Sequence, residues 1–444
     1  MASSHLLLFV FLCSFYLLGL GSTEHNFVVV PTRSLPSEPA CSTMSQVTSD
    51  PNRAFMPLVH RHGPCLPSGA NSAIKPSLAE MLRRDRARKN HIINKALGRT
   101  NTLSDAGVNI PTVLGSAVDS LAYVVTLGLG TPAVQQTVLI DTGSDLSWVQ
   151  CQPCNATECY PQKDPLFDPS KSSTYKTISC QSDECKNLAK DGYHGDCTNG
   201  ATCSFSILYG DGSNTTGEYG RETLTLAPGV TVSDFHFGCG HGQKNLTDKF
   251  DGLLGLGGAS ESLVSQTAEK YGGSFSYCLP PGNGTAGFLA LGAPSNDTAG
   301  FVFSPMHRFH GLATFYTVTL AGISVGGKQL DIPPALFANG MIVDSGSLSA
   351  YPLLPPNDLD LDTCYNFTGH SNVTVPKVSL TFSGGASIDL NVPSGVLVED
   401  CLAFAGDIAD NSPLFGVIGN VNQRTFEVLY DSTRGKVGFR PGAC

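Results

Sequence analysis

Short apolar runs that end in glycine-rich turns recur along most of this chain, and no helical period is sustained over a long span. One such run is "AYVVTLGLGTP", residues 122–132, and a similar run is "FYTVTLAGISVGG", residues 315–327. Runs of this kind are typical of β-strands separated by tight turns. The high glycine count of 48 and the low charged fraction of 14% fit the same interpretation. The pattern therefore predicts an all-β fold.

The order of the apolar segments indicates an internal duplication. Each of these two runs precedes a segment ending in Asp, then Ser or Thr, then Gly, then Ser: "VLIDTGSDLSWVQ" contains Asp141 and "MIVDSGSLSAYPLL" contains Asp344. Each Asp motif is followed by two apolar residues and a glycine, in "FDGLLGLG" (250–257) and "LFGVIGN" (414–420). A repeat of this length is a whole lobe. A site built from one Asp of each lobe would lie where the two lobes meet.

The N-terminal residues read as a secretory signal. Residues 6–20 are an apolar run followed by Gly21 and Ser22, although no Lys or Arg precedes the run. A membrane anchor is the alternative, but the run is shorter than the ~20 residues that a span needs. We assign residues 1–22 to a signal peptide, and we expect no membrane attachment after its removal.

Residues 23–107 differ from the rest and predict a basic prosegment. "SLAEMLRRDRARKNHIINKAL" begins with a capping box of Ser77 and Glu80, so it predicts a helix. An ordinary solvated basic helix is the alternative. The segment carries 11 Lys and Arg against 6 Asp and Glu, whereas residues 108–444 carry 16 against 31. A basic N-terminal segment ahead of an acidic body favours a removable prosegment that is held against the body by charge. The acidic body argues against nucleic-acid binding, because it would repel phosphate.

Cysteine usage also favours an oxidising compartment. Three of the 15 cysteines, Cys13, Cys41 and Cys65, precede the body, and the remaining 12 suit six disulfides. A zinc site at Cys151 and Cys154 is the alternative, but secretion favours disulfides, and we expect no metal. Seven N-x-[ST] sequons predict glycosylation at Asn155, Asn214, Asn245, Asn283, Asn296, Asn366 and Asn372.

The paired Asp motifs predict a two-carboxylate site. Carboxylates about 3 Å apart share a proton, so one can act as general base on a water while the other acts as general acid. An isolated copy would more often be a turn-forming Asp. Thr142 and Ser345 can hydrogen-bond across the lobe interface, and glycines let N–H groups approach the carboxylates. We expect supporting roles for Thr142, Gly143, Ser144, Ser345, Gly346 and Ser347.

These motifs resemble the pepsin-like aspartic proteases, specifically the plant nepenthesin-like branch. The resemblance covers residues from about 118 to 444 and rests on "DTGSDLSWVQCQPC", "YGDGS", "FGCG", "FSYCL" and "VLYDSTRGKVGF". It implies two β-rich lobes, at 108–305 and 306–444, with the cleft between them. It also implies that Asp141 and Asp344 are catalytic and that no cofactor is needed. Polypeptide substrates and the chain's own prosegment are the expected partners of a monomer.

The resemblance assigns a flap and a set of disulfides. Tyr209 and Gly210 lie in "SILYGDGSNTTGEYGRETLTL", which reads as a hairpin that could close over a substrate, and Trp148 would support Tyr209. Packing roles are the alternatives for Tyr209 and Trp148. The implied disulfide pairs are Cys151–Cys154, Cys159–Cys239, Cys180–Cys203, Cys185–Cys197, Cys278–Cys444 and Cys364–Cys401.

The C-terminal lobe reads as shortened. Family members run through an apolar-rich helix after the second Asp motif, whereas here "LSAYPLLPPNDLDL" leads directly to "DTCYNF". Prolines 352, 355 and 356 disfavour a helix there. A weakened variant and a shortcut that the fold tolerates are both consistent with this.

The sequence predicts a secreted acid endopeptidase made as a zymogen. The alternative is a catalytically weak or inactive binding or inhibitor protein on the same fold, but both Asp motifs are intact. Extracellular space, including the apoplast, and vacuole are compatible destinations. Substrate preference and the prosegment cleavage site do not follow from the sequence.

Overall fold

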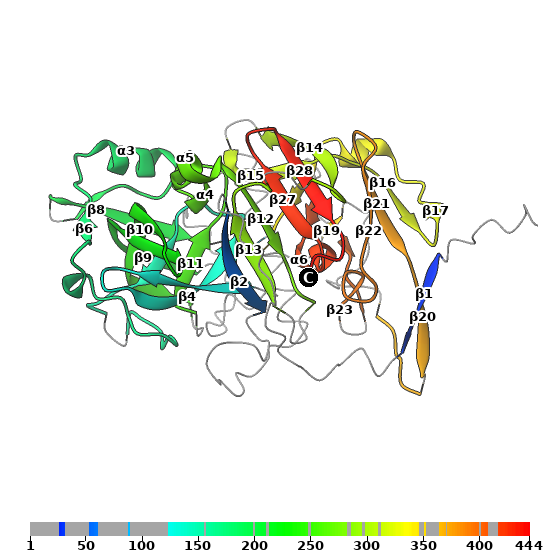
Figure 1. Cartoon of the computed structure of the whole chain (residues 1–444), viewed down its shortest axis with the longest axis horizontal. Helices are drawn as coiled ribbons and strands as arrows, with labels where there is room; N and C mark the ends of the chain where they lie inside the picture. Colours follow the sequence, from blue (N-terminus) through cyan, green and yellow to red (C-terminus); the bar gives the residue numbers. More distant parts are fainter. Residues whose placement is uncertain are drawn as a thin grey trace, which may run out of the picture.

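The computed structural model of the chain describes residues 26–31, 53–60, 88, 123–154, 157–198, 200–209, 213–246, 250–281, 286–294, 298–309, 312–345, 350–351, 364–369, 371–398, 401–406 and 416–444. These residues form a β-rich molecule of two lobes. The N-terminal lobe, cyan and green, lies on the left of Figure 1, and the C-terminal lobe, yellow to red, lies on the right. The all-β, bilobal fold predicted from the sequence is confirmed.

The N-terminal lobe holds its Asp motif at the end of a central strand. Strand β4 (Val134–Asp141) pairs antiparallel with β3 (Tyr123–Leu129) and parallel with β11 (Gly252–Gly255). The other strands are β5 (Trp148–Gln150), β6 (Lys176–Thr177), β7 (Cys197–Thr198), β8 (Thr202–Leu208), β9 (Asn214–Ala227), β10 (Val230–Lys244), β12 (Ser274–Cys278) and β13 (Gly287–Leu291). The predicted flap hairpin is formed by β8 and β9, which pair antiparallel.

The C-terminal lobe repeats this arrangement. Strand β18 (Met341–Val343) pairs antiparallel with β15 (Leu312–Val318) and parallel with β26 (Gly416–Ile418). The other strands are β14 (Val302–Phe309), β16 (Leu320–Val325), β17 (Lys328–Gln329), β19 (Ala350–Tyr351), β20 (Asn372–Pro376), β21 (Val378–Phe382), β22 (Ser387–Asp389), β23 (Leu397–Val398), β24 (Cys401–Leu402), β25 (Ala405–Gly406), β27 (Glu427–Asp431) and β28 (Lys436–Arg440).

The backbone pairing shows how far the duplication extends. After the first Asp motif the chain returns as β5, which pairs antiparallel with β11, and after the second it returns as β19, which pairs antiparallel with β26. Trp148 lies opposite Leu253 in the first lobe, and Ala350 lies opposite Val417 in the second. The strand that follows the Asp loop is therefore present in both lobes. Residues 346–349 and 352–363 lie outside the described residues, so the predicted shortening stays a prediction.

Part of the predicted prosegment belongs to the sheet that joins the lobes. Strand β2 (Ala54–His60) lies between β13 and β3 and pairs antiparallel with both. Its inward side chains, Ala54, Met56 and Leu58, are at most 1% exposed. The same sheet continues through β12 and β27 to β28 and β14. The predicted lobe boundary at residues 305 and 306 falls within β14. A further prosegment strand, β1 (Phe27–Pro31), pairs with β20 at the right edge of Figure 1.

Helices in the described part of the chain are short. They are α3 (Asp183–Lys190), α4 (Leu263–Gln266), α5 (Ala268–Tyr271), α6 (Asn420–Gln423) and the 3₁₀ turns η2 (Pro169–Lys171) and η3 (Pro334–Phe337). Helix α3 begins at a Ser182 cap, whose side chain accepts a hydrogen bond from the Cys185 N–H group. Of the predicted basic helix only Arg88 is described, and it is helical. The signal peptide lies outside the described residues.

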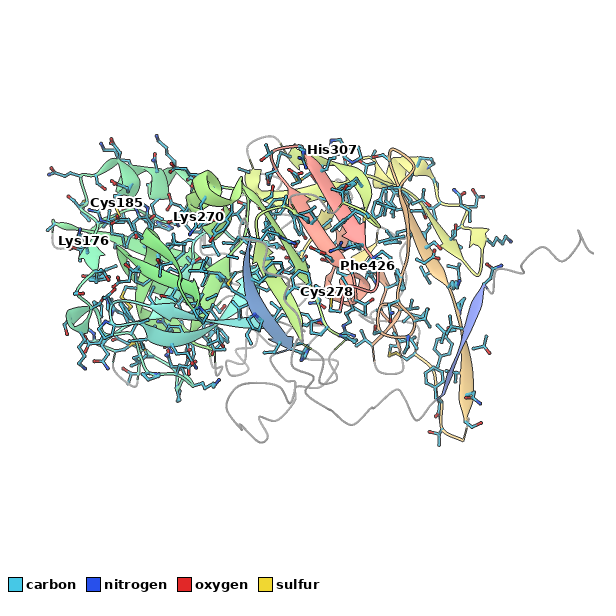
Figure 2. The ribbon with its side chains drawn as sticks, in the orientation of Figure 1. Lys176, Cys185, Lys270, Cys278, His307 and Phe426 are labelled. Carbon is cyan, nitrogen blue, oxygen red and sulfur yellow. A yellow bond between two sulfur atoms is a disulfide. The ribbon has the colours of Figure 1, made fainter. Side chains whose placement is uncertain are left out.

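Four of the six predicted disulfide pairings differ from those in the structure. The chain forms Cys278–Cys444 and Cys364–Cys401 as expected. In place of Cys151–Cys154 and Cys159–Cys239 it forms Cys151–Cys239 and Cys154–Cys159. In place of Cys180–Cys203 and Cys185–Cys197 it forms Cys180–Cys197 and Cys185–Cys203. Figure 2 marks Cys185 in the N-terminal lobe and Cys278 near the centre.

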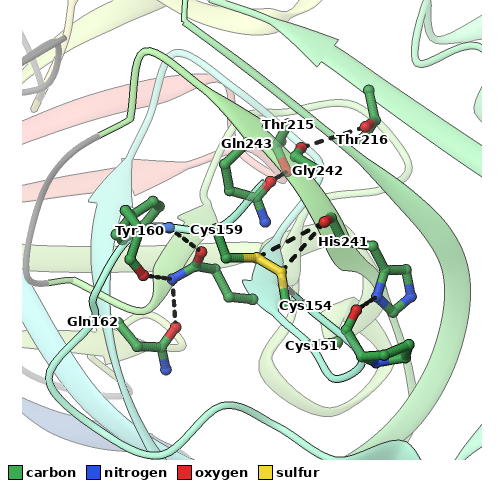
Figure 3. Close-up of a disulfide and its surroundings, with 12 residues drawn as sticks. Cys151, Cys154, Cys159, Tyr160, Gln162, Thr215, Thr216, His241, Gly242 and Gln243 are labelled. Atoms are coloured by element: carbon green, nitrogen blue, oxygen red, sulfur yellow. Dashed lines mark hydrogen bonds between the residues drawn. A yellow bond between two sulfur atoms is a disulfide. The ribbon is translucent and has the colours of Figure 1, made fainter. Parts of the chain in front are cut away.

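Strand pairing explains the first correction. Strand β5 runs parallel to β10 with Val149 opposite Cys239, and Cys151 continues β5 by donating from its N–H group to the Gly240 carbonyl at 2.9 Å. Cys151 is therefore held beside Cys239. Cys154 is left to pair with Cys159, as Figure 3 shows, and the His241 carbonyl oxygen lies 3.3 Å from the Cys154 sulfur.

Helix packing explains the second correction. Cys185 and Leu188 form the buried side of α3, and Cys203 is buried on the neighbouring strand β8. The two buried sulfurs meet in the interior of the lobe. Cys180 pairs with the exposed Cys197 instead.

A buried carboxyl group, Asp251, contacts the strand that carries Asp141 and lies next to the half-buried Asp164. Asp251 is fully buried; its carboxylate accepts hydrogen bonds from the Thr137 N–H group at 2.5 Å and the Asp164 N–H group at 3.2 Å. Burial raises the pKa of Asp251 to about 8, the Thr137 N–H group opposes this rise, and the nearby Asp164 carboxyl adds to it. The folded chain therefore holds a proton that the unfolded chain releases near pH 4.

Asp251 contributes more stability to the fold in acid than at neutral pH. Because the folded pKa of Asp251 is raised, its contribution is fully present below pH ~4 and is lost as pH rises towards ~8. We expect Asp251→Asn to reduce the fall in melting temperature between pH 4 and pH 7.5, measured by calorimetry. The control is Asp389→Asn on the exposed side of β22. An unchanged pH dependence in Asp251→Asn would contradict this assignment.

Candidate active site

The two Asp motifs meet at the ends of equivalent strands. Asp141 ends β4, and its carbonyl accepts a hydrogen bond from the Leu256 N–H group at 2.8 Å. Asp344 follows β18, and its N–H group donates to the Ile418 carbonyl at 3.1 Å. The two Asp residues are 3% and 0% exposed. The parallel pairing with β11 and β26 thus fixes each carboxylate from its own lobe.

Reciprocal hydrogen bonds join the two loops across the lobe interface. The Thr142 N–H group donates to Ser345 Oγ at 3.2 Å, and the Ser345 N–H group donates to Thr142 Oγ1 at 2.9 Å. Thr142 Oγ1 also lies 3.2 Å from Asp344 Oδ1. Both residues are 1% exposed. The cross-lobe contact predicted for Thr142 and Ser345 is therefore present.

Local donors from the first loop surround Asp141. The Gly143 N–H group donates to Asp141 Oδ1 at 3.0 Å, and Ser144 Oγ donates to Asp141 Oδ2 at 2.5 Å. A Cβ atom at Gly143 would lie 3.4 Å from Oδ1 of both Asp141 and Asp344 and 2.8 Å from Arg88 Nη2. A side chain at this position would contact both carboxylates and would collide with Arg88, so glycine leaves room for the guanidinium group on the dyad.

Arg88 of the predicted prosegment lies on the dyad. Its Nε and Nη2 atoms are each 3.1 Å from an oxygen of Asp344, and Nη2 also contacts Asp141 Oδ1. Burial lowers the pKa of Arg88, but the carboxylates of Asp141 and Asp344 outweigh that effect and raise it well above its usual value. A guanidinium held by two carboxylates occupies the place where a water between them would have to lie.

The flap tyrosine and the tryptophan are in contact. Trp148 Nε1 donates to Tyr209 Oη at 2.6 Å, and the Tyr209 N–H group donates to the Ser213 carbonyl at 2.8 Å. Trp148 is 1% exposed, whereas Tyr209 is partly exposed at the end of β8. The structure thus brings together the two residues that the resemblance had linked. Closure of Tyr209 over a substrate stays a prediction.

Residues near the C-terminus hold the second Asp. Gln423 Nε2 donates to the Asp344 carbonyl at 3.0 Å and to the Ile418 carbonyl at 2.6 Å. Asn420 Nδ2 donates to the Ser345 carbonyl at 3.3 Å, and Tyr430 Oη donates to the Val343 carbonyl at 3.3 Å. Sequence reasoning did not identify this support. The one feature of the sequence that could have indicated these residues is the position of "GNVNQ", which follows the apolar pair in "LFGVIGN".

Several predicted residues cannot be placed. Gly210, Gly346, Ser347 and the sequon residues Asn155, Asn283 and Asn296 lie outside the described residues. Asn214, Asn245, Asn366 and Asn372 are described, and their glycosylation stays a prediction. Within the described ranges no group of three or more His, Cys, Asp or Glu side chains is arranged to hold a metal ion. No helix in the described part of the chain has the length and hydropathy of a membrane span.

The geometry suits general acid–base chemistry. Asp141 and Asp344 are buried, contact the same guanidinium group, and come from lobes that are fixed to each other by hydrogen bonds. Two such carboxylates cannot both ionise readily without a cation between them. Without the Arg88 guanidinium group the two carboxylates would share a proton. One of them would then be a base and the other an acid, both next to the position that the guanidinium group occupies.

Comparisons with known proteins agree with this site. Residues 123–293 match the family described as xylanase inhibitor N-terminal, and residues 347–441 match xylanase inhibitor C-terminal. An aspartyl protease family protein of Arabidopsis thaliana is 35% identical over 96% of this chain and 95% of its own length. The aspartic proteinase nepenthesin-1 of Nepenthes gracilis is 33% identical over 72% of this chain and 78% of its own length.

Solved structures show the same fold. Basic 7S globulin from soybean aligns with a TM-score of 0.55 at 20% identity, over 72% of this chain and 91% of its own. Conglutin gamma from lupine seeds aligns with a TM-score of 0.55 at 19% identity, over 74% of this chain and 93% of its own. Taken with the sequence relatives and the paired Asp motifs, the chain belongs to the nepenthesin-like family of plant aspartic proteases.

Proposed function

We propose that this chain is an aspartic endopeptidase that is made as a zymogen, enters the secretory route and cleaves polypeptides at acid pH. The observation that carries the proposal is the buried pair Asp141 and Asp344, held across the lobe interface by Thr142 and Ser345. Relatives of this chain are named as aspartyl proteases and aspartic proteinases, which supports peptidase activity at the level of the family. The acid optimum follows from two carboxylates that must hold one proton between them.

The chain's own groups would divide the chemistry between them. One carboxylate takes a proton from a water, which attacks the substrate carbonyl carbon, while the other donates its proton to the carbonyl oxygen. Ser144 and the Gly143 N–H group hold Asp141 in orientation, and Gln423 holds the backbone of Asp344. The flap residues Tyr209 and Trp148 would then cover the bound peptide.

Arg88 supports the zymogen proposal. At neutral pH its guanidinium neutralises the dyad and fills the space that a reacting water needs. Acid protonates the carboxylates and weakens the ion pairs, so the basic segment can leave and be cleaved at around residues 100–115. The secretory route is supported by the six disulfides, since such bonds persist in oxidising compartments. Extracellular space and the vacuole are both possible destinations of this route.

A binding role on the same fold is the second candidate. The family description names xylanase inhibitors, so the fold also serves proteins that bind other enzymes. The intact Asp motifs favour the protease. The described contacts that hold the backbone at Asp344 come from residues 416–430, and this bears on the shortened lobe. We therefore favour a shortcut that the fold tolerates.

Replacing either dyad residue should abolish proteolysis. Asp141→Asn and Asp344→Asn each remove the carboxylate that acts as base or acid, so we expect kcat/KM to fall by roughly a thousandfold or more. Cleavage of denatured haemoglobin is measured from pH 2 to pH 7, with and without pepstatin, and the wild type should give a bell-shaped profile. Asp389→Asn serves as the surface control. Full activity in either dyad variant would rule out the assignment.

Replacing Arg88 should shorten the lag before activity appears. Arg88→Ala removes the cation from the dyad, so on transfer to about pH 5 we expect pepstatin-sensitive cleavage to start several-fold earlier. Arg88→Lys keeps the charge but not the forked geometry, so its lag should be intermediate. Arg84→Ala, in the same basic stretch, is the matched control. An equal lag for the Arg88→Ala and Arg84→Ala variants would show that Arg88 does not hold the dyad closed.

Restoring a family-length helix should affect stability more than catalysis. Inserting that helix after Tyr351 would cover apolar surface, at roughly 25 cal/mol per Å², so the melting temperature should rise. Because Asp344 is held by β26, Gln423 and Tyr430, kcat/KM should stay within about twofold of the original chain. A large gain in kcat/KM would instead mean that the short lobe misplaces Asp344.

A further inference from the structure

Asp145 is a buried carboxylate next to the dyad that the reaction described above does not use. It lies in the loop between β4 and β5, in the same short loop as Asp141, and is 1% exposed. A carboxylate this deeply buried is retained only where donors compensate for its lost hydration. Its donors therefore show what this part of the loop is attached to.

Three separate segments donate hydrogen bonds to the Asp145 carboxylate. Thr314 Oγ1, from β15 of the second lobe, donates to Oδ2 at 2.6 Å. The Ala259 N–H group, from the loop after β11, donates to Oδ1 at 2.8 Å. Tyr193 Oη donates to Oδ2 at 3.2 Å and accepts from the Asp145 N–H group at 3.1 Å. Tyr193 lies in the cysteine-rich segment, which runs from Cys180 to Cys203 and contains two disulfides. One side chain thus joins the catalytic loop to both lobes and to that segment.

Tyr193 is itself held firmly by the cysteine-rich segment. Its N–H group donates to the Leu188 carbonyl of α3 at 3.1 Å, and its carbonyl accepts from the Ser206 N–H group of β8 at 3.0 Å. Helix α3 and strand β8 are joined by Cys185–Cys203. The ring is 5% exposed and packs in the cluster that contains Trp148. The Tyr193 hydroxyl therefore reaches Asp145 from a fixed position.

Ser144 links Asp145 to the chemistry. It directly precedes Asp145, its hydroxyl donates to Asp141 Oδ2 at 2.5 Å, and its carbonyl accepts from the Gly257 N–H group at 2.9 Å. The Ser144 carbonyl and the Asp145 N–H group belong to one planar peptide group, so a displacement of that group changes the backbone of Ser144 as well. A hydrogen bond from Ser144 favours the charged form of the carboxylate that receives it. Displacing Ser144 would make the dyad take up its proton at higher pH.

We propose that Asp145 and Tyr193 are positioning residues through which the cysteine-rich segment and the second lobe hold Ser144 against Asp141. The inference rests on the proposed protease function, because it assigns these residues to the same dyad. The cysteine-rich segment then has a role beyond its own stability: it fixes the proton affinity of the catalytic pair.

Matched substitutions separate positioning from simple packing. Tyr193→Phe removes one hydroxyl and keeps the ring, and Thr314→Val removes the other donor at constant shape. Thr314→Ser keeps that donor and should behave as wild type. Tyr271→Phe, a buried tyrosine of α5, controls for loss of a hydroxyl elsewhere in the core.

The first measurement does not depend on turnover. In the full-length chain after acid incubation, aspartates labelled with ¹³C at the carboxyl carbon are titrated by NMR, and Asp141→Asn and Asp344→Asn assign the dyad signals. We expect Tyr193→Phe and Thr314→Val to raise the titration midpoint of the dyad by about one pH unit. Among the described residues, Tyr193, Tyr316 and Glu261 interact electrostatically with Asp145, and Arg88, Tyr277 and Tyr430 interact with Asp344.

The second measurement is the pH profile of pepstatin-sensitive cleavage. We expect kcat to fall about tenfold in Tyr193→Phe and Thr314→Val, with KM nearly unchanged and the acidic limb displaced to higher pH. Midpoints and profiles in both variants that match Tyr271→Phe would overturn the positioning role. If the two variants displace the midpoint but the wild-type chain cleaves nothing, the positioning role is upheld and the protease function is rejected. Normal cleavage by the wild-type chain, with no displacement of the midpoint in either variant, would reject the positioning role and uphold the protease function.

Discussion

Two carboxylates buried beside each other impose the constraint on which the rest of this structure depends. Asp141 and Asp344 repel each other when both are ionised, and a buried carboxylate without donors costs several kcal/mol. The chain meets this cost by bringing donors to both groups from adjoining loops, and by the reciprocal bonds of Thr142 and Ser345. In the intact chain Arg88 adds a positive charge between them. We propose that the same arrangement makes the pair reactive once that charge leaves.

Duplication supplies the geometry, but the two halves are supported differently. In each lobe a parallel strand, β11 or β26, fixes the backbone at the Asp. The first loop is then tied down by Asp145 and the cysteine-rich segment that carries Tyr193. The second is tied down by Gln423 and by residues of β27 near the C-terminus. A change of length after β19 therefore leaves the described support of Asp344 in place.

Local patterns account for what the sequence could predict. The apolar runs, the Asp motifs and the hairpin of β8 and β9 each depend on a few neighbouring residues, so their positions follow directly from the chain. The disulfide pairing depended on which strands became neighbours, and the parallel contact of β5 with β10 has no local signal. Arg88 could not be distinguished from the other basic residues of its segment, because its partners Asp141 and Asp344 are distant in sequence. Tyr193 was hidden for the same reason, since its partner is distant in sequence.

The proposed prosegment is attached to the body by two kinds of force. Arg88 is held by charge, so acid weakens its contacts as the dyad takes up protons. Strand β2 is held by backbone pairing with β3 and β13 and by buried apolar side chains, which carry no charge. The ion pair of Arg53 with Glu427, directly before β2, adds one charged contact. Opening of the dyad and departure of β2 from the sheet are therefore separate events with separate physical triggers. In the activation that we propose, acid acts on the first, whereas the second exposes two strand edges and apolar surface that something else must cover.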